Sequence, residues 1–253
     1  MRALPGQGPG TWFTADAVVA VFSPQPNLRS APVDDGAPMR WSSAPGRIAR
    51  MTTARPARKT GSPGRPGYDL DSLLAVAVKV FNDKGYDGTS MEVLAQRLGI
   101  TKSSIYHHVS GKSELLELAL SRALNALFAV TTEEKATSGR YIDRLEYLVR
   151  RSVEVLAAEL PYVTLLLRVR GNTAVERRAL ARRREFDAFV SDLVVAAAEE
   201  GDLRPGIDPA LTSRLVFGTV NSLIEWYRPR TGGTVADLAD AVVELTFDGL
   251  RRT

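Results

Sequence analysis

The sequence predicts an all-α protein in which three short helices precede a larger helical bundle, and three observations support this fold class. Apolar residues recur at helical spacing, as Leu73, Ala77 and Phe81 do at i, i+4 and i+8. No stretch after Asp69 keeps the strict alternation of a strand, and no Asn-Gly hairpin turn occurs. Ser, Thr, Asp, Gly and Pro residues fall where helices are expected to start and end.

The first 67 residues are rich in Gly, Pro, Ala and Ser and have no sustained apolar period, so we expect residues 1–67 to be a disordered extension. Its last part is a basic arm without acidic residues, which carries Arg55, Arg58, Lys59 and Arg65. The arm is either a solvated linker or a DNA contact that places Arg65 in a minor groove. Met51 opens an ordinary-looking N-terminal stretch, and we hypothesise that translation starts there.

Three helices are predicted for residues 68–114. The first has a wide apolar face and ends at Gly85. Thr89 and Glu92 have the spacing of a capping box, which predicts a short second helix that ends at Gly99.

A third short helix and a second domain follow. Thr101 is expected to cap the third helix, which extends to Val109. Ser110 is expected to cap a longer fourth helix, which leads into residues 115–253. Caps and Gly or Pro breaks predict five more helices, nine in all, at residues 141–158, 162–169, 174–200, 209–227 and 235–251.

Two very short helices joined by a tight Gly turn indicate a DNA-binding helix-turn-helix. Four apolar residues are expected to face inward and fix the crossing of the pair, namely Leu94, Leu98, Ile100 and Ile105. The outward residues of the second helix are polar: Lys102, Ser103, Ser104, Tyr106 and His107. Such side chains at a helix N-terminus reach base edges or phosphates, and the sequence leaves open which of the two each one meets.

Composition excludes other classes of protein. The 253 residues include no cysteine, which excludes disulfides and thiolate metal sites, and no apolar run approaches the roughly 20 residues of a membrane-spanning helix. We therefore expect a cytoplasmic protein. His107 and His108 point about 100° apart on a helix, so no metal site is expected. Motifs for phosphate loops, zinc sites and nucleophile turns are absent, so we expect no catalytic residue and no cofactor.

Five short motifs cover residues 69–120. They are Phe-x-x-x-Gly-Tyr at 81–86, Thr-Ser at 89–90, Gly-Ile-Thr at 99–101, Tyr-His-His at 106–108, and Lys112 followed by Leu-Leu at 115–116. Together they resemble the DNA-binding domain of the TetR/AcrR family of bacterial regulators. Val109 stands where a Phe is more usual, which is a conservative apolar change.

The resemblance implies a homodimer that binds a palindromic operator and represses transcription until a small molecule binds its C-terminal domain. The implied DNA-contacting residues are Ser90, Thr101, Lys102, Ser103, Ser104, Tyr106, His107 and Lys112. His108 is expected to pack against the domain. An activator, or a regulator without a ligand, is the alternative, whereas nothing in the sequence favours an enzyme or a carrier.

A helical family member needs a pocket that is apolar with a few polar groups. The candidate lining residues, each of which could equally be plain core, are Leu124, Leu127, Phe128, Val163, Leu166, Leu167, Phe186, Phe189, Thr219 and Trp226. The last two helices carry more apolar surface than a monomer needs to hide. We expect a four-helix dimer interface there, with Leu215, Phe217, Val220, Ile224, Leu238, Val242 and Leu245.

Two features bear on the effector. The stretch from Ile224 to Pro229 resembles that of actinobacterial family members that respond to acyl-coenzyme A thioesters, which implies an acyl-CoA or a related hydrophobic acid derivative. Five arginines follow the break at Gly171 and are most simply the exposed face of a long helix. The alternative is a site for an anionic group such as a coenzyme A phosphate, formed by Arg177, Arg178, Arg182, Arg183 and Arg184.

Overall fold

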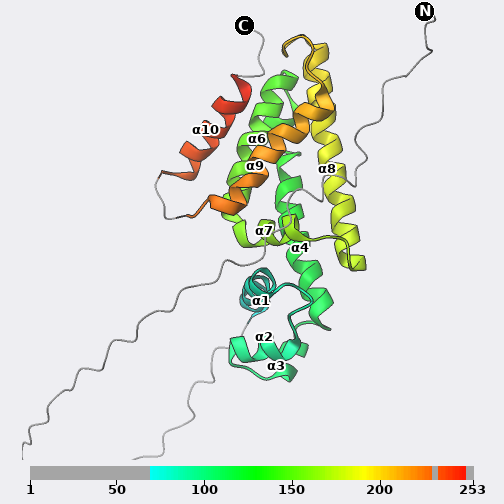
Figure 1. The fold of residues 1–253 in the computed structure, drawn as a ribbon, viewed down its shortest axis with the longest axis vertical. Coiled ribbons are helices and arrows are strands. Elements are labelled where there is room, and N and C mark those ends of the chain that lie inside the picture. Colours follow the sequence, from blue (N-terminus) through cyan, green and yellow to red (C-terminus); the bar gives the residue numbers. More distant parts are fainter. Residues whose placement is uncertain (1–68, 230–232, 249–253) are drawn as a thin grey trace, which may run out of the picture. The chain divides into compact units, whose positions relative to one another are not determined.

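The computed structural model describes residues 69–229 and 233–248, and the ten elements in these ranges are all α-helices (Figure 1). The predicted all-α fold is therefore confirmed. The predicted number of nine helices was wrong, because α5 (Glu134–Thr137) has only four residues and is too short to show an apolar period. The predictions for residues 1–67, which include Arg65 and a start at Met51, lie outside the described residues.

The first three helices are α1 (Leu70–Lys84), α2 (Met91–Leu98) and α3 (Lys102–Tyr106). The Asp69 side chain caps α1 by accepting a hydrogen bond from the Ser72 backbone N–H, at 2.8 Å. At the other end Gly85 has a φ of 76°, a conformation that favours glycine and lets the chain turn away. The predicted end of α1 is thus confirmed.

Two predicted caps were wrong. The N-cap of α2 is Ser90, whose side chain accepts from the Val93 backbone N–H, whereas buried Thr89 donates its hydroxyl to the Gly85 carbonyl at 2.7 Å. Before α4 the cap position is Gly111, and the Glu114 carboxylate instead accepts hydrogen bonds from the N–H and hydroxyl of Ser110, at 2.6 and 2.7 Å. In both places neighbouring residues compete for one role, and a hydrogen bond to a residue four positions away decides between them.

The remaining helices form the bundle, and α4 connects it with the first three (Figure 1). They are α4 (Lys112–Val130), α6 (Tyr141–Ala158), α7 (Leu160–Arg168), α8 (Ala174–Glu199), α9 (Pro209–Trp226) and α10 (Val235–Phe247). Most predicted bounds are confirmed within about two residues, a scatter usual for helix ends. The helix predicted for residues 235–251 is described only to Phe247.

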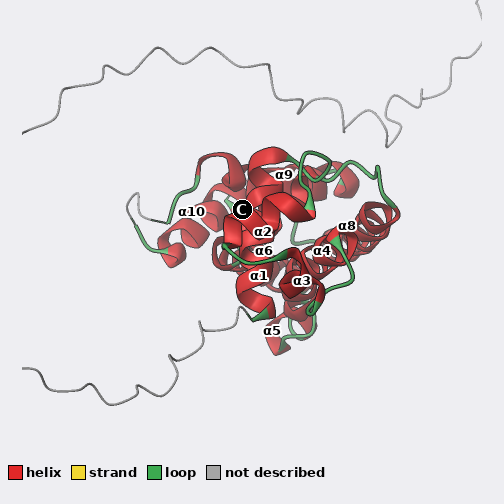
Figure 2. Ribbon diagram, turned by 90° about the horizontal axis from the view of Figure 1, so that it is seen from below, coloured by secondary structure: helices red, strands yellow, loops and turns green. Residues whose placement is uncertain are grey.

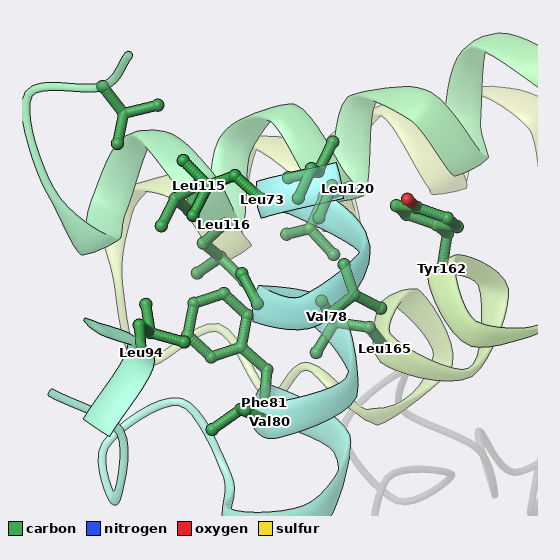
Figure 3. Close-up of a cluster of buried hydrophobic side chains, with 14 of the residues drawn as sticks. Leu73, Val78, Val80, Phe81, Leu94, Leu115, Leu116, Leu120, Tyr162 and Leu165 are labelled. Carbon is green, nitrogen blue, oxygen red and sulfur yellow. The ribbon is translucent and has the colours of Figure 1, made fainter. Parts of the chain in front are cut away.

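The described residues pack around two hydrophobic clusters. The first lies between α1, α2, α3 and the N-terminal half of α4, and Leu73, Phe81, Leu94 and Leu115 point into it (Figure 3). Helix α7 joins this first cluster through Tyr162 and Leu165 (Figure 3). The second cluster lies between α6, α8, α9 and α10. The core beneath the helix-turn-helix therefore extends beyond residue 114 and includes a helix of the bundle.

Loops connect helices α1 to α9 (Figure 2), and the longest of these, residues 200–208, joins α8 to α9. None of these helices has both the length and the hydropathy required to span a membrane.

Candidate DNA-binding and effector sites

Helices α2 and α3 are fixed against each other by a turn of three residues. Gly99 ends α2 in the left-handed conformation, with φ at 66°, and Thr101 starts α3 by accepting a hydrogen bond from the Ser104 backbone N–H. The hydroxyls of Thr101 and Ser104 are also hydrogen-bonded to each other, at 2.9 Å. Ile105 is completely buried and anchors α3 to the first cluster. The predicted helix-turn-helix is present, although α3 ends at Tyr106 and not at Val109.

The outward side of α3 is polar and open to solvent. Lys102, Ser103, Tyr106 and His107 are exposed, and Ser104 is half-buried. The Lys102 ammonium forms an ion pair with the Glu92 carboxylate of α2. This hydrogen bond from Lys102 lowers the pKa of Glu92 to about 2 and raises that of Lys102. Lys102, one of the predicted DNA contacts, is thus paired with a carboxylate of α2.

Two other predicted DNA contacts have partners within the domain. Ser90 caps α2, as described above. The Lys112 ammonium donates to the Tyr86 backbone carbonyl at 2.8 Å and lies 4.1 Å from the centroid of the Tyr86 ring. That ring in turn packs against Phe81, with centroids 5.5 Å apart. Lys112 therefore also holds the turn after α1 against the start of α4.

The position of His108 differs from the prediction. His108 is exposed and does not pack against the domain, whereas the next residue, Val109, is buried in the first cluster. The reason is that Val109 lies four residues after the buried Ile105 and its backbone N–H donates to the Ile105 carbonyl at 3.2 Å, so Val109 and not His108 shares the inward side with Ile105.

A cavity of about 500 Å³, a volume that includes its open mouth, lies within the bundle. Helices α4, α6, α7, α8 and α9 all contribute to its wall. The lining residues are Ala123, Leu127, Ser152, Val155, Leu156, Val163, Leu166, Leu167, Arg183, Phe186, Asp187, Phe217, Val220 and Asn221. The wall is mostly apolar with a few polar groups, as the walls of small-molecule sites are.

Half of the predicted pocket residues line this cavity: Leu127, Val163, Leu166, Leu167 and Phe186. Phe128 and Phe189 pack among core residues, and Leu124 is buried in the first cluster. Thr219 donates its hydroxyl to the Leu215 carbonyl at 3.0 Å, and Trp226 is 59% exposed. The structure places these other residues away from the cavity.

The cavity wall has a few polar groups that the sequence reading missed. Arg183 and Asn221 are half-buried, and Asp187 is exposed, so these three border the opening. The protein around the Asp187 carboxyl raises its pKa by desolvation, although Arg183 and Arg214 act in the opposite direction. Ser152, in contrast, belongs to the buried part of the wall. A polar residue within the otherwise aliphatic buried face of α6 was the pattern that could have indicated it.

Helix α7 contacts both the cavity and the first three helices. The Asn82 side-chain amide of α1 donates to the Pro161 carbonyl at 2.8 Å. Arg122 of α4 donates two hydrogen bonds to the Glu159 carboxylate, at 2.7 and 3.0 Å, and its guanidinium lies 4.3 Å from the Tyr162 ring centroid. The opposite side of α7 supplies three residues of the cavity wall. Helix α7 therefore touches both the cavity and α1.

The predicted dimer residues fall into two groups. Leu215 and Leu245 are 63% and 76% exposed, whereas Phe217, Val220 and Val242 are buried within the subunit and Ile224 and Leu238 are partly buried against the second cluster. The buried residues of α9 face the cavity and the second cluster, and its other side exposes a stripe with helical spacing: Leu211, Leu215 and Trp226. An apolar stripe is thus exposed on α9, but of its three residues only Leu215 was predicted for the dimer interface.

A helix-turn-helix joined to an α-helical domain with a cavity is the architecture of a one-component transcriptional regulator. Residues 73–119 match the profile described as bacterial regulatory proteins of the tetR family, and residues 138–250 match that of the tetracyclin repressor-like C-terminal domain. The chain belongs to the TetR family.

Several known proteins are similar to the chain. SCO3833, a TetR-family member from Streptomyces coelicolor A3, is 60% identical over 71% of this chain and 91% of its own, with a TM-score of 0.67. The HTH-type transcriptional repressor KstR2 of Rhodococcus jostii strain RHA1 is 29% identical over 181 residues, which are 70% of this chain and 89% of that protein. AibR, whose crystal structure contains isovaleryl coenzyme A and operator DNA, is 23% identical over 70% of this chain and 97% of its own, with a TM-score of 0.60, and shares the fold.

Proposed function

We propose that this protein is a ligand-responsive repressor, which binds a palindromic operator as a homodimer and is released when a small molecule enters the cavity. The observation that carries the proposal is helix α7, which touches both the cavity and α1 of the DNA-binding domain. Membership of a family with known repressors supports it. Such a protein acts as a regulator and not as an enzyme, and it works where the bacterial chromosome lies, in the cytoplasm.

The proposed DNA-reading surface is the exposed side of α3. Hydroxyls near its N-terminus and the Tyr106 and His107 rings one turn later are arranged as in helices that enter a major groove. Lys102 is expected to meet DNA at the expense of its ion pair with Glu92, because a nearby carboxylate offsets the attraction of the ammonium for a phosphate. Ser90 and Lys112 are expected at the phosphates, where a residue that also stabilises the domain can still donate or accept.

The proposed release mechanism is a shift between two positions of α7. A ligand that fills the cavity presses on Val163, Leu166 and Leu167, which all lie on α7. Movement of α7 is passed to α1 through the hydrogen bond between Asn82 and Pro161, and to α4 through Arg122 and Glu159. The ligand shifts the population only if it binds the displaced form more tightly.

The exposed stripe on α9 is the proposed dimer contact. Leu211, Leu215 and Trp226 lie on one side of the helix, and Leu245 of α10 is also exposed. Apolar side chains exposed in a row are costly in water and favour association with an identical stripe. Replacing Leu215 with Glu should give monomers in sedimentation velocity at micromolar concentration. A dimer that persists in this variant would place the interface elsewhere.

The proposed effector is an acyl-CoA or a related hydrophobic acid derivative. The buried wall of the cavity is mostly apolar and suits an acyl group, and we expect the nucleotide part of coenzyme A to stay at the mouth. Arg183 borders the mouth, where it acts electrostatically on Asp187 without a direct ion pair, while Arg178 and Arg182 are engaged by Glu117 and Asn125. A phosphate would therefore find Arg183 more readily than the other arginines.

The test is a gel-shift assay on the DNA upstream of the protein's own gene, at stated salt, with and without octanoyl-CoA, octanoate and free coenzyme A. Repression with an acyl-CoA effector predicts a shift that octanoyl-CoA alone weakens. A shift that none of the three changes would contradict this effector class but leave the DNA-binding function intact. No shift with any genomic fragment would contradict the function itself.

A further inference from the structure

The cavity wall contains a hydroxyl whose hydrogen-bonding capacity is unused. Ser152 lies in the middle of α6, is 3% exposed, and its Oγ has no partner among the described residues. The buried residues around it on the same face of α6 are aliphatic, including Val149, Val153 and Leu156. An alanine would fill this place without leaving a polar atom unsatisfied, so a serine here calls for a physical reason.

Other buried polar groups of the described chain are better satisfied. The buried hydroxyl of Ser213 is hydrogen-bonded to the Ala210 carbonyl at 3.1 Å and to the Ser191 hydroxyl at 3.0 Å. Asn82 and Asp202 each have one unpartnered buried oxygen, but the Asn82 amide donates to Pro161 and the other Asp202 oxygen binds Arg140. Ser152 differs because its only polar side-chain atom is unpartnered and because it lines the cavity.

The position of Ser152 in the cavity indicates which part of a ligand it would meet. Charged and amide groups border the opening, whereas Ser152 belongs to the buried wall with Leu156, Leu166 and Phe186. A ligand that enters through the mouth therefore presents its far end, and not its head group, to this hydroxyl.

We propose that Ser152 is a specificity-determining ligand contact, and that the effector is an apolar molecule with a carbonyl or hydroxyl oxygen on the part that lies deepest in the cavity. A serine hydroxyl both donates and accepts hydrogen bonds, so either oxygen group satisfies it. A pure hydrocarbon end would leave the hydroxyl unpaired and would be disfavoured. The inference rests on the proposed function, since it specifies the ligand of the same cavity.

The test compares two small probes that differ in one group, 2-indanone and indane, in which a carbonyl replaces a methylene. Binding to the full chain is followed by NMR titration of labelled Leu and Val methyl groups, several of which line the cavity. A purely apolar cavity prefers indane, because the ketone loses more hydration on entry. In the wild-type protein we expect 2-indanone to bind at least as tightly as indane.

The variant Ser152→Ala and the matched control Ser213→Ala separate the proposed contact from a general effect of removing a buried hydroxyl. Ser152→Ala should weaken 2-indanone relative to indane by roughly three- to tenfold, the effect of one neutral hydrogen bond. It should leave the Tm of the free protein unchanged or higher, since no internal hydrogen bond is lost. Ser213→Ala should lower the Tm and keep the wild-type preference.

The outcomes distinguish this inference from the proposed function. If both probes shift the cavity methyl groups but Ser152→Ala leaves their relative affinity unchanged, the Ser152 contact is wrong and the cavity remains a ligand site. If neither probe shifts these methyl groups up to its solubility limit, the Ser152 contact and the proposal that this cavity binds the effector both fall, whereas DNA binding is judged separately by the gel shift.

Discussion

The helix-turn-helix and the cavity are assembled over very different lengths of chain. The residues that shape the DNA-reading surface lie between Thr89 and Lys112, and their caps and turns involve partners a few residues away. The cavity wall uses residues from Ala123 to Asn221 on five helices. A local surface should keep its shape unless its own anchors are removed, whereas the cavity should respond to changes in any of five helices.

The strongest test of this difference is Ile105→Ala. Ile105 is fully buried and holds α3 in place, so its truncation should cost about 2 to 5 kcal/mol of unfolding free energy and abolish operator binding. Urea denaturation and a gel shift would measure the two effects. The control Tyr106→Ala removes an exposed neighbour and should weaken DNA binding with little change in stability. Equal destabilisation by both variants would contradict the anchor role of Ile105.

The next largest effect is expected from the exposed face of α3. Lys102→Ala should weaken operator binding by roughly five- to 100-fold if Lys102 reads a base, and weaken all DNA sequences alike if it holds phosphate. Glu92→Gln frees Lys102 from its ion pair and should therefore strengthen binding to any DNA. Fluorescence anisotropy with operator and unrelated DNA would separate these cases. Unchanged affinity in both variants would mean that Lys102 does not approach the DNA.

A filled cavity should imitate a bound ligand. Val163 lines the cavity from α7, so Val163→Trp should displace this helix and weaken operator binding by about tenfold, within the usual range of allosteric coupling. Adding Asn82→Ala removes the hydrogen bond between α1 and α7 and should restore part of the affinity.

Asn125→Ala is the matched control for this pair of changes. Asn125 accepts hydrogen bonds from Arg182 between α4 and α8, and it has no bond to α1 among those of the described chain. It should not restore binding to Val163→Trp. Equal rescue by both asparagine variants would show that the coupling does not pass through α7.

The smallest expected effect concerns two acids with opposite pKa shifts. The raised pKa of Asp187 means that its charged form is disfavoured in the folded state, so stability is lost as pH rises from the unfolded value of 3.8 through the folded pKa. Asp187→Asn should therefore raise the Tm at pH 7.5 and not at pH 3.5. The gain in unfolding free energy should be less than about 1 kcal/mol, because the side chain is exposed.

The lowered pKa of Glu92 predicts the reverse dependence. The stability that its ion pair contributes is present above the unfolded value of 4.5 and is lost as pH falls towards about 2. Glu92→Gln should thus lower the Tm slightly at pH 7.5 and have no effect near pH 2. Thermal unfolding across this pH range would test both variants, and shifts of the same sign at pH 7.5 would contradict the assignment.

The sequence predicted the first three helices well because their determinants are local. Gly99 in the left-handed conformation and the Thr101 cap are visible as residue types at fixed spacing, and the buried positions of Leu94 and Ile105 follow from the helical period. The choice between Thr89 and Ser90 as cap was missed, since it depends on a hydrogen bond from Thr89 back to Gly85.

The cavity was harder to predict because apolar residues of a bundle look alike in sequence. Phe217 and Trp226 both lie on α9, yet Phe217 lines the cavity and Trp226 is exposed. Which side of α9 faces inward is decided by its packing against α6 and α8, far away along the chain. Polar residues such as Ser152 and Asp187 also line the cavity, and a prediction based on apolar positions did not include them.

The ion pair between Lys102 and Glu92 has a consequence for the search along a chromosome. A regulator must find its operator among roughly a million or more competing sites, and attraction to ordinary DNA grows with every lysine free to displace counterions from phosphates. Because Glu92 neutralises Lys102 on the free protein, this lysine adds little to that general attraction. In the proposed complex its charge becomes fully available when a docked base or phosphate competes with the carboxylate, so the pair would trade overall affinity for discrimination.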